Sequence, residues 1–342
     1  MRRSLAECLE FCLVYQSLTS RFPDVTTSEI LAGLVPPPHF AHSTFQNYVP
    51  DPNQPSQLLA LQNLQKFAVS IVTKPRFFSR DRNDSKGRYL DGGFGVGKTH
   101  LLAALWFSVD VPKVYGTFVE FTNLVGLLGF SDTVELLSNS KLLCIDEFEL
   151  DDPGDTVLMS TLMMRLVEKG VFLAATSNTL PDRLGEERFA AEDFQREIQG
   201  LAAHFESVRI DGDDYRHRGI PVANSPFLEK ELKEIAQSSA SASFDEFESL
   251  SKHLASIHQS KYGALVSGLE TVCVSNLQTI TDQANALRWV VLADRLYDSD
   301  IRFYASGIAL DQLFAPELLA GGYRKKYRRA LSRLIALSNL SK

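Results

Sequence analysis

One stretch decides the fold of this 342-residue chain, Gly92-Gly93-Phe94-Gly95-Val96-Gly97-Lys98-Thr99. It matches the pattern Gly-x-x-x-x-Gly-Lys-Thr of a phosphate-binding loop, whose glycines let backbone N–H groups turn inward around phosphate oxygens. The flanks agree, because a short strand pattern at Arg88–Asp91 precedes the loop and a run of helix formers follows it. That helix adds the partial positive charge of its amino terminus. We therefore predict a Walker A nucleotide loop rather than a chance glycine turn.

Two side chains of this loop have distinct predicted tasks. We expect Lys98 to reach the β- and γ-phosphates of ATP and Thr99 to offer its hydroxyl to Mg²⁺. The next residue, His100, is included in the nucleotide-binding set. ATP and Mg²⁺ are the cofactors that this chemistry requires.

An acidic pair, Asp146-Glu147, ends the apolar strand pattern Leu142–Ile145. This is the arrangement of a Walker B strand, in which we expect Asp146 to hold Mg²⁺ through water and Glu147 to polarise the attacking water as general base. A base inside the nucleotide site favours hydrolysis of ATP over phosphoryl transfer to a small acceptor, which argues against a kinase. The chain has no Asn-Lys-x-Asp and no Leu-Ser-Gly-Gly-Gln run, which disfavours a GTPase and an ABC transporter ATPase.

A polar amide, Asn178, follows the apolar run Val171–Thr176. In an open parallel sheet the carboxyl ends of all strands face one ligand crevice, so this amide is placed like a sensor that orients the water or contacts the γ-phosphate. A second interpretation stays open, in which Ser177 and Asn178 only turn the chain and cap a helix near Pro181.

Apolar runs that alternate with longer helical patterns indicate an α/β core, with a parallel sheet covered by helices on both faces. The predicted strands are Arg88–Asp91, Thr117–Phe121, Leu142–Ile145, Val171–Thr176 and Val208–Ile210. We predict an amino-terminal extension at 1–45, the P-loop core at 46–220 and a mainly helical carboxyl-terminal domain at 221–342. The small, polar run Gln237–Ser243 is typical of a linker or mobile loop.

Composition narrows the class of protein. A net charge of −7 argues against a surface wholly devoted to nucleic acid or anionic lipid, although a local patch stays open. The four cysteines have neither CxxC spacing nor the density of a disulfide scaffold. No apolar run has the length of a membrane span, and Glu7 and Glu10 interrupt any signal-peptide core. We therefore expect a cytoplasmic protein without a transmembrane segment.

The order of the motifs, Walker A, then Asp146-Glu147, then Asn178, resembles the AAA+ class of P-loop ATPases. A narrower likeness is to the AFG-type AAA+ ATPases, the family of the ZapE-type cell division proteins. The matching runs are Leu143–Asp155, Ala175–Pro181, Asp214-Tyr215-Arg216, Tyr48–Gln57 and Ala330–Leu334. The resemblance implies a cytoplasmic ATPase with a helical lid domain, associated in bacteria with the division ring and in mitochondria with protein quality control.

The resemblance also implies a homo-oligomeric ring, in which an arginine of one subunit completes the site of its neighbour. Arg188 and Arg196 follow Asn178, and we prefer Arg196 as this catalytic finger. The run Gly185–Ala191 departs from the Gln-Arg-x-x-Phe-Leu-Pro arrangement of other branches, which leaves the position of the finger open. Surface ion pairs are an equally good interpretation of both arginines.

The segment Tyr323–Arg333 carries six cations and no acid in an acidic protein. By resemblance, Arg333 is the sensor of a lid that closes over the phosphates. The other cations suit nucleic acid, an acidic membrane surface, the acidic stretch Glu147–Asp155 of an adjacent subunit, or a solvated helix face.

Three functions remain as hypotheses. The leading one is an ATPase that couples hydrolysis to remodelling of a protein client, with division-ring components as the expected partners. The second is a nucleic-acid adaptor akin to helicase-loader ATPases, which often carry the Gly-Lys-Thr-His-Leu run of Gly97–Leu101. The third is an ATP-gated scaffold for division proteins that turns over slowly.

Overall fold

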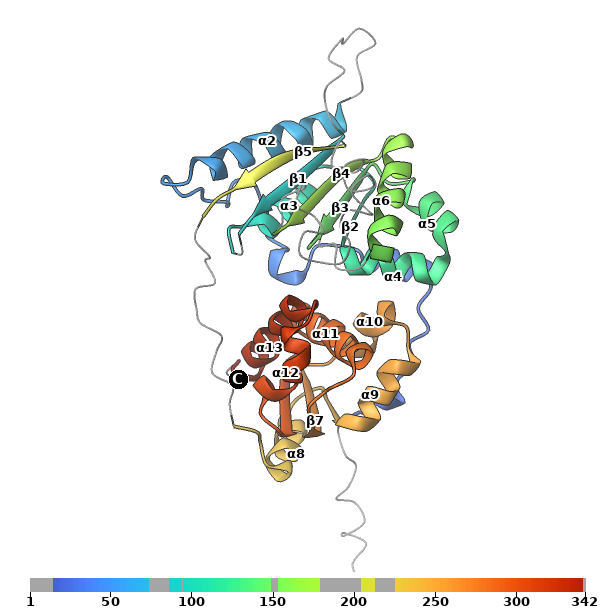
Figure 1. Ribbon diagram of the computed structural model, residues 1–342, viewed down its shortest axis with the longest axis vertical. Coiled ribbons are helices and arrows are strands. Elements are labelled where there is room, and N and C mark those ends of the chain that lie inside the picture. Colours follow the sequence, from blue (N-terminus) through green and yellow to red (C-terminus); the bar gives the residue numbers. More distant parts are fainter. Residues whose placement is uncertain are drawn as a thin grey trace, which may run out of the picture. The chain divides into compact units, whose positions relative to one another are not determined.

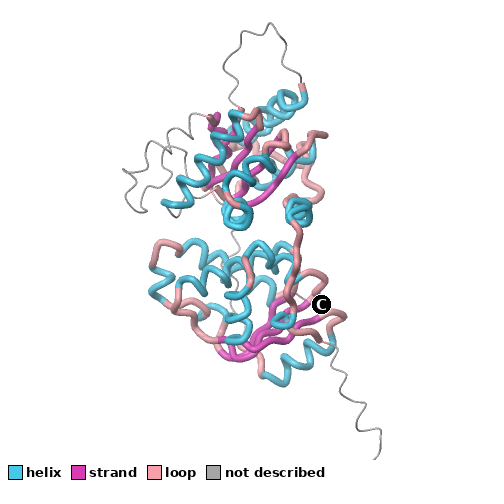
Figure 2. Tube along the Cα trace, turned by 90° about the vertical axis from the view of Figure 1, so that its right-hand side faces the viewer, coloured by secondary structure: helices cyan, strands magenta, loops and turns pink. Residues whose placement is uncertain are grey.

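The structure is a computed structural model that describes residues 15–73, 86–93, 95–148, 153–178, 204–212 and 225–340. The chain divides into two compact units (Figure 1). One is Thr26–Gly219, and the other combines the two ends of the chain, Met1–Val25 and Ile220–Lys342. In each unit helices flank a sheet (Figure 2). We call Thr26–Gly219 the P-loop unit and the other the carboxyl-terminal unit.

The P-loop unit is built on a five-stranded parallel sheet of order β2-β3-β4-β1-β5. Its strands are β1 (Gly87–Gly92), β2 (Lys113–Thr117), β3 (Leu142–Asp146), β4 (Phe172–Ser177) and β5 (Phe205–Ile210). The strand that ends in the Walker A loop, β1, lies between β4 and β5. Since all strands are parallel, the predicted polar strand ends share one edge of the sheet.

Helices cover both faces of this sheet, as the sequence predicted (Figure 1). The helices in the described residues of the unit are α1 (Thr27–Gly33), α2 (Pro55–Val72), α3 (Lys98–Ser108), α4 (Phe118–Leu128), α5 (Phe130–Leu137) and α6 (Pro153–Glu168). Apolar side chains of α4, α5 and α6 pack with Leu143 and Ile145 on one face. Those of α2 and α3 pack with Leu142 and Cys144 on the other. The alternation along β3 therefore separates two cores.

One predicted strand is displaced. The sequence predicted a strand at Thr117–Phe121, whereas the strand is Lys113–Thr117 and helix α4 begins at Phe118. The cause is a capping box, in which the Thr117 hydroxyl accepts the Glu120 N–H at 3.3 Å and the Glu120 carboxylate accepts the Thr117 N–H at 2.7 Å. These bonds start a helix where the β-branched and aromatic residues indicated a strand.

The carboxyl-terminal unit has a three-stranded parallel sheet of order β6-β7-β8. None of these strands was predicted from the sequence. Its strands are β6 (Ala242–Glu246), β7 (Thr271–Leu277) and β8 (Arg302–Gly307). Its helices are α8 (Glu229–Ser238), α9 (Phe247–Ser256), α10 (Tyr262–Val266), α11 (Gln283–Asp298), α12 (Pro316–Ala320) and α13 (Arg324–Ser338). The run Gln237–Ser243 is not a linker, because it joins α8 to β6 and its Ala242 and Ser243 are buried in the sheet.

The predicted extension at 1–45 is divided between the two units where it is described. Gln16 pairs with Ser243 beside β6, and the Leu18 N–H donates to the Asp245 carboxylate at 3.0 Å. Farther along, the Tyr115 N–H of β2 donates to the Leu34 carbonyl at 2.9 Å. In the described part of the chain, no helix combines the length and the apolar character needed to cross a membrane.

Candidate active site

The Walker A loop joins β1 to α3, as its sequence predicts. Gly95 and Gly97 have φ angles of 71° and 91°, the left-handed conformation that glycine adopts without strain. A Cβ at Gly97 would also lie 2.7 Å from the Tyr48 ring. The loop therefore needs glycine at position 97 for both conformation and space. Phe94, which belongs to the predicted binding set, lies outside the described residues.

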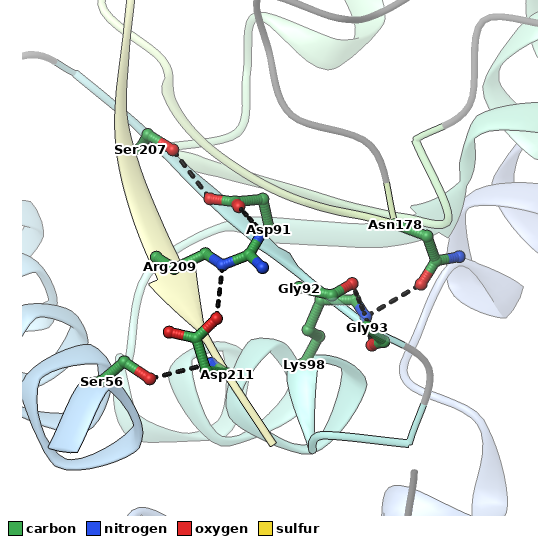
Figure 3. A network of polar contacts seen from close by, with 9 residues as sticks. All are labelled: Ser56, Asp91, Gly92, Gly93, Lys98, Asn178, Ser207, Arg209 and Asp211. Atoms are coloured by element: carbon green, nitrogen blue, oxygen red, sulfur yellow. Dashed lines mark hydrogen bonds and ion pairs between the residues drawn. The ribbon is translucent and has the colours of Figure 1, made fainter. Parts of the chain in front are cut away.

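The Lys98 ammonium is held at the carboxyl ends of two neighbouring strands (Figure 3). It donates to the Gly92 carbonyl at 2.9 Å and to the Gly93 carbonyl, both at the end of β1. It also donates to Asn178 Oδ1 at 2.9 Å, just after β4. The pairing of β1 with β4 brings Lys98 and Asn178 together across 80 positions of sequence. The predicted sensor amide is thus in contact with the predicted phosphate-binding lysine.

Asp146 is 5% exposed, and its carboxylate accepts hydrogen bonds from three surrounding elements. Thr99 of α3 donates to Oδ1 at 3.2 Å, and Tyr115 of β2 donates to Oδ2 at 3.0 Å. Thr176 of β4 donates to Oδ1. The sequence predicted the meeting of Thr99 and Asp146, whereas it singled out neither Tyr115 nor Thr176. Burial, with the charge of Asp146, raises the pKa of Tyr115 well above its usual range, so the phenol keeps its proton.

Glu147 has a left-handed backbone, with φ of 54°. This conformation costs a non-glycine residue about 1–2 kcal/mol, and such strain gathers at functional sites. Its N–H donates to Thr176 Oγ1 at 3.0 Å and to Asp146 Oδ1 at 3.1 Å, and the next N–H, of Phe148, donates to the Thr176 carbonyl at 2.7 Å. Three backbone hydrogen bonds therefore hold the turn that presents the predicted base.

The oxygens around Asp146 have the chemistry of a magnesium site that is shared with phosphate. Mg²⁺ in nucleotide sites is usually held by one or two carboxylates, phosphate oxygens and waters. Asp146 and Thr99 supply a carboxylate and a hydroxyl 3.2 Å apart. Among the described residues no group of three or more histidine, cysteine, aspartate and glutamate side chains forms a metal cage. The residues present fit Mg²⁺ that arrives with a nucleotide.

A second polar network fixes the strand that leads into the Walker A loop (Figure 3). Asp91 of β1 is 1% exposed, and Arg209 of β5, its partner in register, donates to its carboxylate at 2.8 Å. Ser207 donates to the other carboxylate oxygen at 2.8 Å. Arg209 also donates to Asp211 at 2.7 Å, and these bonds to Asp91 and Asp211 raise the pKa of Arg209. The sequence carried no signal for the contacts of Asp91, because Ser207 and Arg209 meet it only across the sheet.

We expect Arg209→Leu to lower the free energy of unfolding by about 2 kcal/mol, because the buried Asp91 carboxylate would keep only Ser207 among its described side-chain partners. Urea unfolding followed by circular dichroism measures the effect as a shift in midpoint at unchanged slope. Arg165→Leu is the matched control, since Arg165 and Glu168 form an exposed pair worth less than about 0.5 kcal/mol. Equal midpoints for the two variants would contradict the predicted weight of Arg209.

His100 lies in the first turn of α3, and its side chain contacts the segment before α2. Its Nε2 is 3.1 Å from the Thr44 carbonyl and its Nδ1 is 3.5 Å from Ser43 Oγ. Its ring also lies 5.6 Å from that of Tyr48. The imidazole therefore joins residues 43–48 to the helix that follows the Walker A loop.

Of the two arginines predicted to be catalytic, only Arg333 lies within the described residues. Arg196, like its alternative Arg188, lies outside the described residues. Arg333 is on α13 of the carboxyl-terminal unit, where it forms an ion pair with Asp294 of α11 and lies over the Tyr297 ring. Arg329 contacts the same carboxylate at 3.0 Å. Burial opposes ionisation of Asp294, yet the two guanidinium groups hold its pKa below the usual range. Two of the six cations in Tyr323–Arg333 thus join α13 to α11.

Comparison with known proteins gives matches over most of the chain. A family model described as AFG1-like ATPase matches residues 25–231 and 222–341. The cell division protein ZapE of Escherichia coli K12 is 25% identical over 297 residues, which covers 73% of this chain and 77% of that protein. Lactation elevated protein 1 homolog B of Danio rerio is 24% identical over 57% of this chain and 45% of its own length.

A solved structure described as the DnaC helicase loader aligns with 51% of this chain and 99% of its own, with 18% identity and a TM-score of 0.37.

Proposed function

Because the chain belongs to the AFG1-like ATPase family, we propose that it couples Mg²⁺-dependent ATP hydrolysis to the remodelling of a protein partner at the site of cell division. Family membership itself makes the chain a nucleotide-binding AAA+ ATPase. The observation that supports hydrolysis at this site is the convergence of Lys98, Asp146, Glu147 and Asn178 at one edge of the parallel sheet. The similarity to ZapE, a cell division protein, supports the role in division, and the proposed place of action is the cytoplasm.

In the proposed mechanism each side chain acts on one part of the nucleotide. Lys98 exchanges its carbonyl and amide acceptors for oxygens of the β- and γ-phosphates, and the N–H groups of the glycine loop bind the same phosphates. This exchange releases the Asn178 amide to orient the attacking water or to contact the γ-phosphate. Glu147 accepts the proton of that water.

Thr99 and Asp146 would hold Mg²⁺, which supplies positive charge to the phosphate oxygens. The rest of the proposed site belongs to the oligomer. A guanidinium from a neighbouring copy, Arg196 or Arg188, would stabilise the charge of the transition state, as it does in other nucleotide hydrolases. Arg333 would act as the sensor of the carboxyl-terminal lid.

Chelation of the divalent cation is expected to lower turnover at least about 100-fold, because a bound metal contributes several kcal/mol of charge stabilisation. Phosphate release is measured with Mg²⁺, with EDTA, and after restoration of Mg²⁺ or addition of Ca²⁺. Mg²⁺ should restore turnover and Ca²⁺ should not, because Ca²⁺ prefers more ligands at longer distances. Equal turnover with and without EDTA would reject the metal part of the proposal.

Capture of bound proteins tests the proposal that the client is a division protein. Glu147→Gln loaded with ATP and Mg²⁺ should retain division proteins that it loses with ADP, because a blocked hydrolysis cycle keeps a client bound. Lys98→Ala, which should not hold ATP, is the control for non-specific capture. Division proteins absent from the ATP sample would reject this part of the proposal.

The second candidate function is that of a nucleic-acid adaptor, which the positive charge of α13 favours. The helix has no acidic residue, and Arg324, Lys326 and Arg328 lie in its first turns. An adaptor would bind single-stranded DNA with a strong salt dependence that falls in Arg324→Gln/Arg328→Gln. Arg329 stays unchanged in this test because it contacts Asp294. Slow turnover that no partner stimulates would instead favour the ATP-gated scaffold.

A further inference from the structure

We propose that Tyr115 and Thr176 are positioning residues that aim the Asp146 carboxylate at the metal of the nucleotide site. The inference rests on the proposed function, since it assumes that Asp146 serves Mg²⁺ there. Neither residue belongs to the Walker motifs, and each comes from a strand next to the one that carries Asp146.

The sheet places the three side chains on one face. Strands β2 and β4 flank β3 (Figure 1). Tyr115 lies opposite Cys144, two residues before Asp146. Tyr115, Cys144 and Ala174 belong to the core that α2 and α3 cover. Since side chains two residues apart point to the same face, Asp146 and Thr176 share this face. Tyr115 therefore reaches along the sheet beneath α3, the helix that begins with Lys98 and Thr99.

The hydrogen bonds account for both carboxylate oxygens. Oδ2 accepts from the Tyr115 hydroxyl at 3.0 Å. Oδ1 accepts from Thr176, from Thr99 at 3.2 Å and from the Glu147 N–H at 3.1 Å. The phenol has one proton, and its place in the core directs that proton to Asp146. Tyr115 thus sets the rotation of the carboxylate, because the terminal torsion of an aspartate is otherwise soft.

Thr176 connects this carboxylate to the predicted base. Its hydroxyl donates its single proton to Asp146 Oδ1, and its oxygen accepts the Glu147 N–H at 3.0 Å. One side chain therefore orients the carboxylate and stabilises the left-handed backbone of Glu147. Removal of a side chain that holds a metal ligand in this way typically lowers metal affinity or activity by about 10- to 100-fold.

The test uses Tyr115→Phe, which removes the hydroxyl and keeps the ring in the core. We expect the Mg²⁺ concentration for half-maximal turnover to rise about tenfold. A second readout needs no turnover, namely the affinity for Mn²⁺ in the presence of a non-hydrolysable ATP analogue, measured by electron paramagnetic resonance. It should fall by a similar factor, while affinity for the analogue in EDTA stays unchanged.

Two comparisons separate positioning from a merely structural role. Tyr262→Phe removes a buried phenol that donates to the Leu254 carbonyl at 2.6 Å, and it should leave the Mg²⁺ requirement unchanged. At position 176, Thr176→Val should raise the requirement, whereas Thr176→Ser, which keeps the hydroxyl, should restore it. A Tyr115→Phe protein with the Mg²⁺ requirement and Mn²⁺ affinity of the wild type would overturn the inference. A wild-type protein that turns over equally in EDTA would instead reject the proposed function.

Discussion

Replacing Glu147 by glutamine is expected to lower the turnover number by about 10²- to 10³-fold while ATP binds as before, because a positioned general base contributes on this scale. Glutamine has the size of glutamate but cannot accept the proton of water. The backbone N–H at this position donates hydrogen bonds to Thr176 and Asp146, and the substitution leaves these bonds in place. Single-turnover phosphate release measures the chemical step, and titration with a fluorescent nucleotide measures binding.

Glu168→Gln is the control for this experiment. Glu168 is 65% exposed on α6, where it contacts Arg165, so the loss of its charge should alter neither turnover nor binding. A Glu147→Gln protein that keeps more than a third of wild-type turnover would remove Glu147 from the role of base. Loss of binding together with turnover would point to a damaged loop.

Replacing Lys98 by alanine is expected to weaken ATP binding at least about 100-fold, because truncation of a largely buried charged partner costs about 2–5 kcal/mol. The ammonium lies between the carbonyls of the Walker A loop and the Asn178 amide, where no described side chain of the site replaces its charge. Calorimetric titration with ATP and Mg²⁺ measures the loss, and turnover should fall with it.

Lys66→Ala is the matched control, since Lys66 is exposed on α2 of the same unit. ATP affinity within threefold of wild type in Lys98→Ala would show that the ammonium does not contact the phosphates. Together the two variants separate two contributions. We expect Lys98 to supply affinity for ATP in the ground state and Glu147 to lower only the barrier to hydrolysis.

Residue composition alone gave the wrong structure for two segments. Thr117–Phe121 has strand composition, yet Thr117 and Glu120 form a capping box and the helix begins one residue later. Gln237–Ser243 has linker composition, yet its last two residues, Ala242 and Ser243, are buried in β6. In both cases composition indicated one structure, while a specific hydrogen bond or burial in a sheet selected another.

The sequence by itself determined the family, the parallel α/β fold and the polar strand ends that form the candidate nucleotide site. The glycines of a phosphate-binding loop are contiguous in sequence, and the carboxyl ends of parallel strands lie at one edge of their sheet. The gathering of Lys98, Asp146 and Asn178 at that edge was therefore predictable. Only the tertiary structure decided that Tyr115 and Thr176 hold Asp146 and that Arg209 neutralises Asp91. The physical reason is that these bonds cross between strands far apart in sequence. Which atom meets which then depends on strand order and register, and no local pattern encodes either.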